Sequence, residues 1–147
     1  MKYCIYIQFN TFFTTSSMSQ APFKFKDRAR SFAYALAGLR ILLRTQHNAW
    51  IHAVASVIVI AVGLSLPLSA ADWLALVLAL TLVWMAEAFN TGLELLADAV
   101  TQDHHPLIGQ AKDVAAAAVL LAAIGAAVIG VLVLGPHLLR ALKTACA

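Results

Sequence analysis

The sequence has little charge and almost no cysteine, and both shortages exclude common classes of protein. Charged residues make up 12% of the 147 residues, whereas 62% are hydrophobic. Soluble domains carry about 25% charged residues, so an ordinary soluble domain is not expected. The two cysteines, Cys4 and Cys146, lie near opposite ends of the chain. They form neither a zinc motif nor a disulfide framework.

A glycine-rich phosphate-binding loop is also missing. The stretch from Gly109 to Lys112 has the lysine but lacks the glycine-rich turn that cradles phosphates. The net charge of +3 could suggest nucleic acid, but seven of the ten Lys and Arg residues precede residue 45. This uneven distribution favours a membrane surface instead, and no nucleic-acid partner is predicted.

Long apolar stretches are what the sequence does have. Three blocks, roughly 50–67, 73–96 and 114–135, are close to the length of about 20 residues that crosses a bilayer. They predict an all-α membrane protein with three transmembrane helices, and no second domain is indicated. Trp50 and Trp73 lie near block ends, where aromatic residues are expected.

A basic amphipathic helix is predicted before the first span. From Arg28 to Arg44, apolar residues recur at helical spacing, at Phe32, Leu36, Leu39 and Leu43. Such a helix suits the anionic cytoplasmic interface of a membrane. The alternative is an ordinary solvated helix, which would leave the apolar stripe without a partner. His47 and His52 flank the entry to the first span, where we expect them to act as hydrogen-bonded anchors.

The N-terminal region, residues 1–27, is interpreted as an extension of a single domain that covers residues 28–147. The apolar run in residues 1–17 is broken by Gln8 and Asn10 and has no cleavage site of the signal-peptide type. We expect translation to start at Met18. The turn 66–72 has no Lys or Arg, so the positive-inside rule places the N-terminus and loop 98–113 in the cytoplasm and the tail from Pro136 outside.

The second span carries a polar stripe. At about 100° per residue on a helix, Glu87, Asn90, Thr91, Glu94 and Asp98 share one face. The opposite face is apolar and suits lipid; it carries Leu82, Met85, Ala88, Leu93 and Leu96. Carboxylates at membrane depth cost several kcal/mol each, and five of the seven acids lie in residues 87–113. A functional site is therefore predicted.

The residue types in this stretch suit phosphate and metal chemistry. Glu87 and Glu94 are two turns apart, about 10 Å along the helix, so one can coordinate Mg²⁺ while the other reaches a substrate hydroxyl. Asn90 lies between them, Lys112 can donate to phosphate oxygens, and Asp113 can orient Lys112 or hold metal. The alternative is that these groups simply pair with one another between helices.

These residues resemble a known signature. The stretch from Glu87 to Glu94, then Asp98, His105-Pro106 and the stretch from Ala111 to Ala116, is similar to the motif of the prokaryotic diacylglycerol kinase family, which includes undecaprenol kinases. The resemblance covers about residues 30–135. It implies a surface helix, three spans, a homotrimer with sites built between subunits, and a location in the bacterial inner membrane.

The resemblance also implies roles for individual residues. Glu87 matches the proton acceptor, and Glu94 matches a ligand of the Mg²⁺ ion that bridges the ATP phosphates. Gln46 stands where many members have a second metal-binding Glu, and Gly92 where the motif usually has Ala. Nucleotide contacts are expected from Tyr34, Asp103, His104, His105, Lys112 and Asp113, and substrate contacts or orienting roles from Asn90, Asp98 and Ala116.

The expected activity is therefore that of a lipid kinase that uses Mg²⁺ and ATP and converts diacylglycerol to phosphatidic acid. Undecaprenol is the alternative acceptor. A transport or structural subunit is an alternative of another class, because an acidic stripe could be a cation path. However, residues 73–83, the outer half of the span, contain Thr81 as the one polar residue besides Trp73, which favours the kinase.

Overall fold

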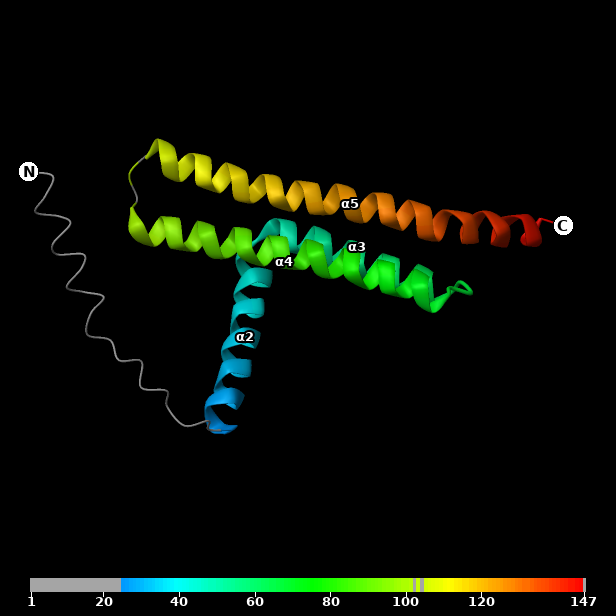
Figure 1. The fold of residues 1–147 in the computed structure, drawn as a ribbon, viewed down its shortest axis with the longest axis horizontal. Coiled ribbons are helices and arrows are strands. Elements are labelled where there is room, and N and C mark those ends of the chain that lie inside the picture. Colours follow the sequence, from blue (N-terminus) through cyan, green and yellow to red (C-terminus); the bar gives the residue numbers. More distant parts are fainter. Residues whose placement is uncertain (1–24, 102, 104, 147) are drawn as a thin grey trace, which may run out of the picture. The chain divides into compact units, whose positions relative to one another are not determined.

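The computed structural model describes residues 25–101, 103 and 105–146 of the chain. These residues form four helices and no strand, which confirms the all-α prediction. The helices are α2 (Phe25–Thr45), α3 (His47–Leu64), α4 (Ala70–Val100) and α5 (Pro106–Ala145) (Figure 1). The proposed start at Met18 lies outside the described residues.

The chain divides into two compact units, residues 1–35 and residues 36–147, and the boundary falls within α2. In the first unit, the described residues 25–35 are helical and exposed, and the Ser31 hydroxyl donates to the carbonyl of Asp27 at 2.9 Å. A helix is therefore present in the predicted region. Its amphipathic character and its place at a membrane surface stay predictions.

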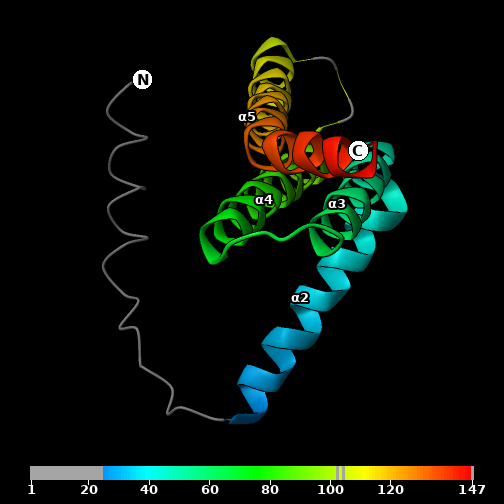
Figure 2. The same ribbon diagram turned by 90° about the vertical axis from the view of Figure 1, so that its right-hand side faces the viewer.

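The second unit contains three helices that are long and apolar enough to cross a membrane, as predicted. Each pair among α3, α4 and α5 is in contact, and the three lie alongside one another in both views (Figure 1, Figure 2). The helices begin several residues before the apolar blocks, and in α4 and α5 local signals mark the start: a capping serine and a proline in the first turn. Ser69, for example, begins α4 with a capping box, in which its hydroxyl accepts from the Asp72 amide and the Asp72 carboxylate accepts from the Ser69 amide.

The turn between α3 and α4 is closely packed. A Cβ atom on Gly63 would lie 2.9 Å from the ring of Trp73 and 3.3 Å from the side chain of Leu68. Gly63 is buried, so a larger residue would force these side chains apart. Trp73 therefore packs directly against the backbone of α3.

The α5 helix is much longer than the predicted span, because it contains 40 residues and continues through Pro136. At 1.5 Å per residue it is about 60 Å long, twice the thickness of the hydrocarbon layer. His137 Nε2 lies 3.5 Å from Asp72 Oδ2 in the first turn of α4. This contact ties the extension of α5 to the start of α4.

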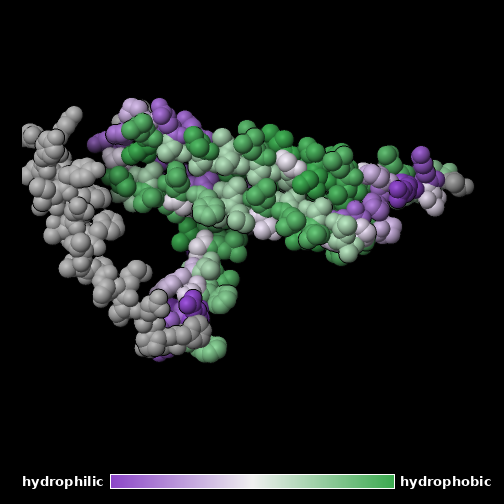
Figure 3. All heavy atoms as spheres, in the orientation of Figure 1, coloured by the Kyte–Doolittle hydropathy of each residue, from purple (hydrophilic) through white to green (hydrophobic). Residues whose placement is uncertain are grey.

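The distribution of polar and apolar side chains between interior and surface is the reverse of that in a soluble protein. Most large apolar side chains of α3, α4 and α5 are exposed, including Leu82, Met85 and Leu96 on the face of α4 that was predicted to meet lipid. The apolar surface lies between more polar ends of these helices (Figure 3). Among the described residues, the ionisable side chain with no exposure is Glu87. This pattern fits a helical unit that is solvated by lipid.

Candidate functional site

The polar stripe of α4 is buried inside the second unit. Glu87 has 0% exposure, Asn90 6% and Thr91 4%, and they are the buried polar residues of the described chain. The Thr91 hydroxyl donates to the carbonyl of Glu87 at 2.9 Å, which satisfies Thr91 within its own helix. Glu87 and Asn90 are therefore the residues whose burial needs an explanation.

Glu94 lies at the centre of a hydrogen-bond network. Its Oε1 accepts from Asn90 Nδ2 at 3.0 Å, and its Oε2 accepts from Gln46 Nε2 at 2.9 Å. Gln46 precedes α3, and its side chain makes no capping hydrogen bond there, which leaves the amide available for Glu94. The structure thus brings together two predicted metal-site residues that are 48 positions apart in the sequence.

A cavity of about 260 Å³ lies beside this network, between α3, α4 and α5. Three members of the stripe, Glu87, Asn90 and Glu94, line it from α4, and the predicted residue Ala116 lines it from α5. The remaining lining residues are Asn48, Ile51, His52, Val119, Leu120 and Ala123. The cavity is therefore polar on the α4 side and apolar on the α5 side.

The Glu87 carboxylate lacks a hydrogen bond in the described part of the chain. Neither of its oxygens has a partner, and the same holds for Oδ1 of Asn90. His52 Nε2 lies 4.0 Å from Glu87 Oε2, which is beyond hydrogen-bond distance. A buried polar group without a partner is destabilising. Three acceptor atoms at one cavity therefore point to a ligand that donates protons or carries positive charge.

Lys112 and Asp98 form the closest ion pair of the site. Lys112 Nζ on α5 lies 2.6 Å from Oδ1 of Asp98 on α4. Their side chains are 36% and 60% exposed, so water screens the pair and it contributes little to stability. For these two residues the structure agrees with the alternative that polar groups pair between helices. Glu87 does not fit that alternative, because neither of its oxygens has a hydrogen-bond partner among the described residues.

The other predicted nucleotide contacts lie away from the cavity lining. Asp113 is exposed on α5, and His105 is exposed just before the first residue of that helix. Asp103 is exposed in the loop between α4 and α5, where its backbone amide donates to Thr101 Oγ1. Tyr34 is 69% exposed in the first unit. His104 lies outside the described residues. The structure therefore brings together five of the predicted site residues: Gln46, Glu87, Asn90, Glu94 and Ala116. It also pairs Asp98 of α4 with Lys112 of α5.

Asn48 and His52 are residues of the cavity that sequence reasoning missed, since His52 was interpreted as an anchor. The pattern held a signal for them: Asn48, His52 and Ser56 are four residues apart and share one face of α3. A polar stripe in one span can face the polar stripe of another. That pairing could have been proposed from the spacing.

The oxygen ligands present fit a magnesium ion that is carried by a nucleotide. Mg²⁺ is usually bound by one or two carboxylates together with substrate phosphates, and Glu94 offers a carboxylate with lone pairs left beside its two hydrogen bonds. The Gln46 amide could offer its oxygen after rotation. No cluster of three or more His, Cys, Asp or Glu side chains that could hold a metal occurs among the described residues.

Several known proteins are similar to this chain over much of its length. The family described as prokaryotic diacylglycerol kinase matches residues 33–134. An undecaprenol kinase from Bacillus subtilis is 36% identical over 109 residues, which cover 74% of this chain and 89% of that protein. A diacylglycerol kinase from Synechocystis is 44% identical over 110 residues, which cover 74% of this chain and 63% of that protein.

A diacylglycerol kinase from Escherichia coli is 29% identical over 108 residues, which cover 74% of this chain and 88% of that protein. The matched region includes the candidate cavity, the whole of α3 and α4, and α5 as far as residue 134. These matches show that the chain belongs to the prokaryotic diacylglycerol kinase family of lipid kinases.

Proposed function

We propose that this lipid kinase transfers the γ-phosphoryl group of ATP, with Mg²⁺, to the hydroxyl of a membrane lipid, and that diacylglycerol is the acceptor. The observation that carries this proposal is the Glu87 carboxylate. It is fully buried, its oxygens have no hydrogen-bond partner in the described part of the chain, and it lines a cavity. An alcohol in that cavity would supply the missing hydrogen bond.

Glu87 acts in this proposal as the base. A general base must lie within hydrogen-bond distance of the proton that it removes. Because no described side chain occupies its oxygens, Glu87 can accept the proton of the lipid hydroxyl without first breaking another bond. Asn90 Oδ1 is also unpaired and can accept a second hydrogen bond from the substrate.

The nucleotide is held next to Glu94. Mg²⁺ there would neutralise charge on the phosphates, and Gln46 would complete its ligands from the start of α3. Lys112 would exchange Asp98 for phosphate oxygens, since the pair is half exposed and easily broken. Tyr34, Asp103, His104, His105 and Asp113 are the further candidates for contacts with the nucleotide.

Diacylglycerol is favoured by the higher identity to the Synechocystis diacylglycerol kinase, 44% against 36% for the undecaprenol kinase. Undecaprenol remains the second candidate, because the match to that kinase covers 89% of its length. The family assignment favours either enzyme over a transport or structural subunit. The N-terminus and the cavity would face the cytoplasm of a bacterial inner membrane, where ATP is present.

A homotrimer would enclose the site. The apolar side chains of α3, α4 and α5 are largely exposed, and neighbouring chains would cover part of them. If Tyr34 of one chain completes a site on another, inactive Tyr34→Ala and Glu94→Gln chains should regain activity when mixed before assembly. A mixture of Glu87→Gln and Glu94→Gln chains should not regain activity, because both residues lie on α4 and one chain therefore supplies both to a site. A fully active monomer in detergent would contradict this assembly.

The proposed activity is tested with the purified full-length chain in phosphatidylcholine vesicles. Dioleoylglycerol, undecaprenol and a long-chain alkanol are offered separately with Mg·[γ-³²P]ATP, and labelled lipid is measured. We expect dioleoylglycerol to give the highest rate and Glu87→Gln to abolish most of it. Labelling of undecaprenol alone would reassign the acceptor, and labelling of no lipid would overturn the proposed function.

A further inference from the structure

His52 lies beside the Glu87 carboxylate. Its Nε2 lies 4.0 Å from Glu87 Oε2, and the two side chains are 15% and 1% exposed. This distance is about 1 Å too long for a hydrogen bond. A small rotation of either side chain would close it. Water does not surround the pair, so such a contact would be little screened.

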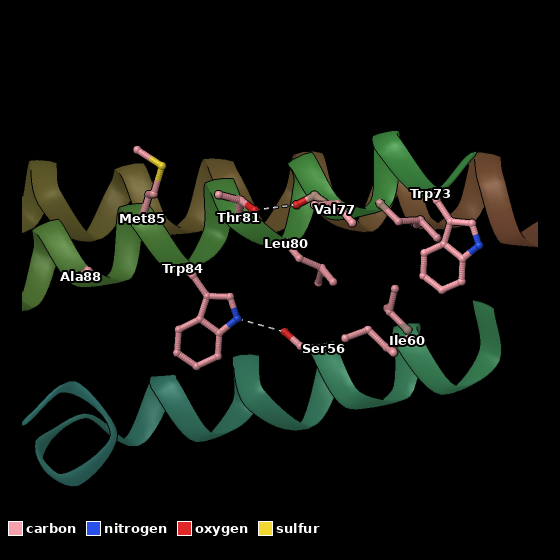
Figure 4. Close-up of a pocket in the computed structure, with 11 residues that line it drawn as sticks. Ser56, Ile60, Trp73, Val77, Leu80, Thr81, Trp84, Met85 and Ala88 are labelled. Carbon is pink, nitrogen blue, oxygen red and sulfur yellow. Dashed lines mark hydrogen bonds between the residues drawn. The ribbon is translucent and has the colours of Figure 1, made fainter. Parts of the chain in front are cut away.

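Two hydrogen bonds join the backbone of α3 at His52 to α4. The Ser56 hydroxyl, one turn later on α3, donates to the carbonyl of His52 at 2.7 Å. Trp84 on α4 then donates its Nε1–H to Ser56 Oγ at 3.1 Å (Figure 4). Trp84 is three residues before Glu87 on the same helix. These bonds join the backbone of α3 at His52 to the helix that carries Glu87.

His52 also lies where two cavities meet. One is the polar cavity of about 260 Å³, and the other is an apolar groove of about 590 Å³ along α3, α4 and α5. The residues common to both are Ile51, His52 and Ala123, and His52 is the polar one. A lipid chain in the groove would bring its hydroxyl end past His52 to Glu87.

Two lining residues of α3 carry a polar side chain, Asn48 and His52; Asn48 is exposed, whereas His52 Nε2 lies 4.0 Å from Glu87 Oε2. From α4, the other charged group that lines the cavity is Glu94, which is already bonded to Asn90 and Gln46. The α5 side contributes Ala116, Val119, Leu120 and Ala123, none of which titrates or donates. Among the described residues that line the cavity, His52 is thus the basic one.

We propose that His52 is the positioning residue for Glu87: its Nε2–H donates to Glu87 Oε2 and turns Oε1 toward the acceptor hydroxyl. The inference rests on the proposed function, in which Glu87 takes the hydroxyl proton. That proton moves to Oε1 while the hydroxyl oxygen bonds to the γ-phosphorus and the bond between this phosphorus and ADP breaks. His52 keeps its own protons throughout.

The test compares two substitutions of similar size. Gln can place a side-chain N–H close to the position of Nε2, whereas Leu fills the space without a donor. In vesicles with dioleoylglycerol and Mg·ATP, His52→Leu should lower kcat about tenfold, as expected for one hydrogen bond to a charged group. His52→Gln should keep kcat within about threefold. The KM for ATP should be unchanged in both, because Glu94 and Gln46 are untouched.

A double variant separates positioning from general damage. If His52 acts through Glu87, His52→Leu should have no further effect on the residual activity of Glu87→Gln, since coupled residues are not additive. Ser56→Ala gives a second test outside the cavity that holds Glu87, Asn90 and Glu94. It removes the hydroxyl that joins the His52 carbonyl to Trp84 of α4, so the position of His52 relative to Glu87 becomes less fixed, and it should lower kcat about two- to fivefold at constant KM for ATP.

Three results would overturn the inference: normal kcat in His52→Leu, equal loss in His52→Leu and His52→Gln, or a full tenfold loss added to Glu87→Gln. Should both His52 variants fail to fold, an unchanged kcat in Ser56→Ala overturns it, and the expected loss there supports it. These outcomes require an active wild-type enzyme. A wild type that phosphorylates neither dioleoylglycerol nor undecaprenol would refute the proposed function itself.

Discussion

Replacing Glu87 by Gln is the change that tests the proposed mechanism most directly. Gln keeps the size of the side chain and removes its basicity. Loss of a general base lowers turnover by about 10²-fold or more, which corresponds to about 2.7 kcal/mol or more of transition-state stabilisation. We therefore expect kcat to fall by at least this factor while the KM for ATP stays nearly constant.

The stability of this variant should change little. Neither oxygen of Glu87 accepts a hydrogen bond in the described part of the chain, so the substitution removes none. Glu94→Gln provides the matched comparison on the same helix, because the Glu94 carboxylate accepts two hydrogen bonds. A hydrogen bond to a charged group contributes about 1.5–3 kcal/mol, and the loss of one should lower the midpoint of thermal unfolding by roughly 3–10 °C.

The assay measures the initial rate of lipid phosphorylation in vesicles and thermal unfolding in detergent for both variants. Glu87→Gln should be inactive and stable, and Glu94→Gln inactive and less stable. Near-normal turnover in Glu87→Gln would exclude Glu87 as the base. A large loss of stability in Glu87→Gln would show that its burial serves the fold, which would refute the reasoning from its unpaired oxygens.

The remaining predictions concern the metal, the phosphates and packing. Gln46→Glu adds a negative charge beside Glu94 and should lower the Mg²⁺ concentration for half-maximal rate; an identical Mg²⁺ dependence would place Gln46 away from the ion. Lys112→Met should raise the KM for ATP several-fold with little effect on unfolding, because the exposed pair contributes about 1 kcal/mol or less. Gly63→Ala should destabilise by about 1–3 kcal/mol, whereas Gly92→Ala, whose Cβ would meet nothing within 4 Å, should stabilise by about 0.5–1 kcal/mol. Thermal unfolding in detergent measures both, and a stable Gly63→Ala would contradict the packing of this turn.

The amino-acid sequence alone determined the class of fold and one face of the site. Runs of about 20 apolar residues leave a helix as the structure that satisfies every backbone group in lipid. The helical period then places Glu87, Asn90 and Glu94 on one face, and the structure confirms that they line one cavity. Helix ends were less predictable, since α5 continues through Pro136 for ten residues beyond the apolar block.

Which residues of the other helices meet that face was decided by the tertiary structure. Gln46 reaches Glu94 across 48 residues, Lys112 pairs with Asp98 across 14, and His52 lies beside Glu87 across 35. Periodicity orients each helix about its own axis, but it does not fix how far one helix is shifted or rotated against the next. In lipid, the shift and rotation of one helix against the next depend on close packing of small side chains and on a few hydrogen bonds between helices. These contacts form only when the helices have come together, so the sequence of one helix does not reveal them.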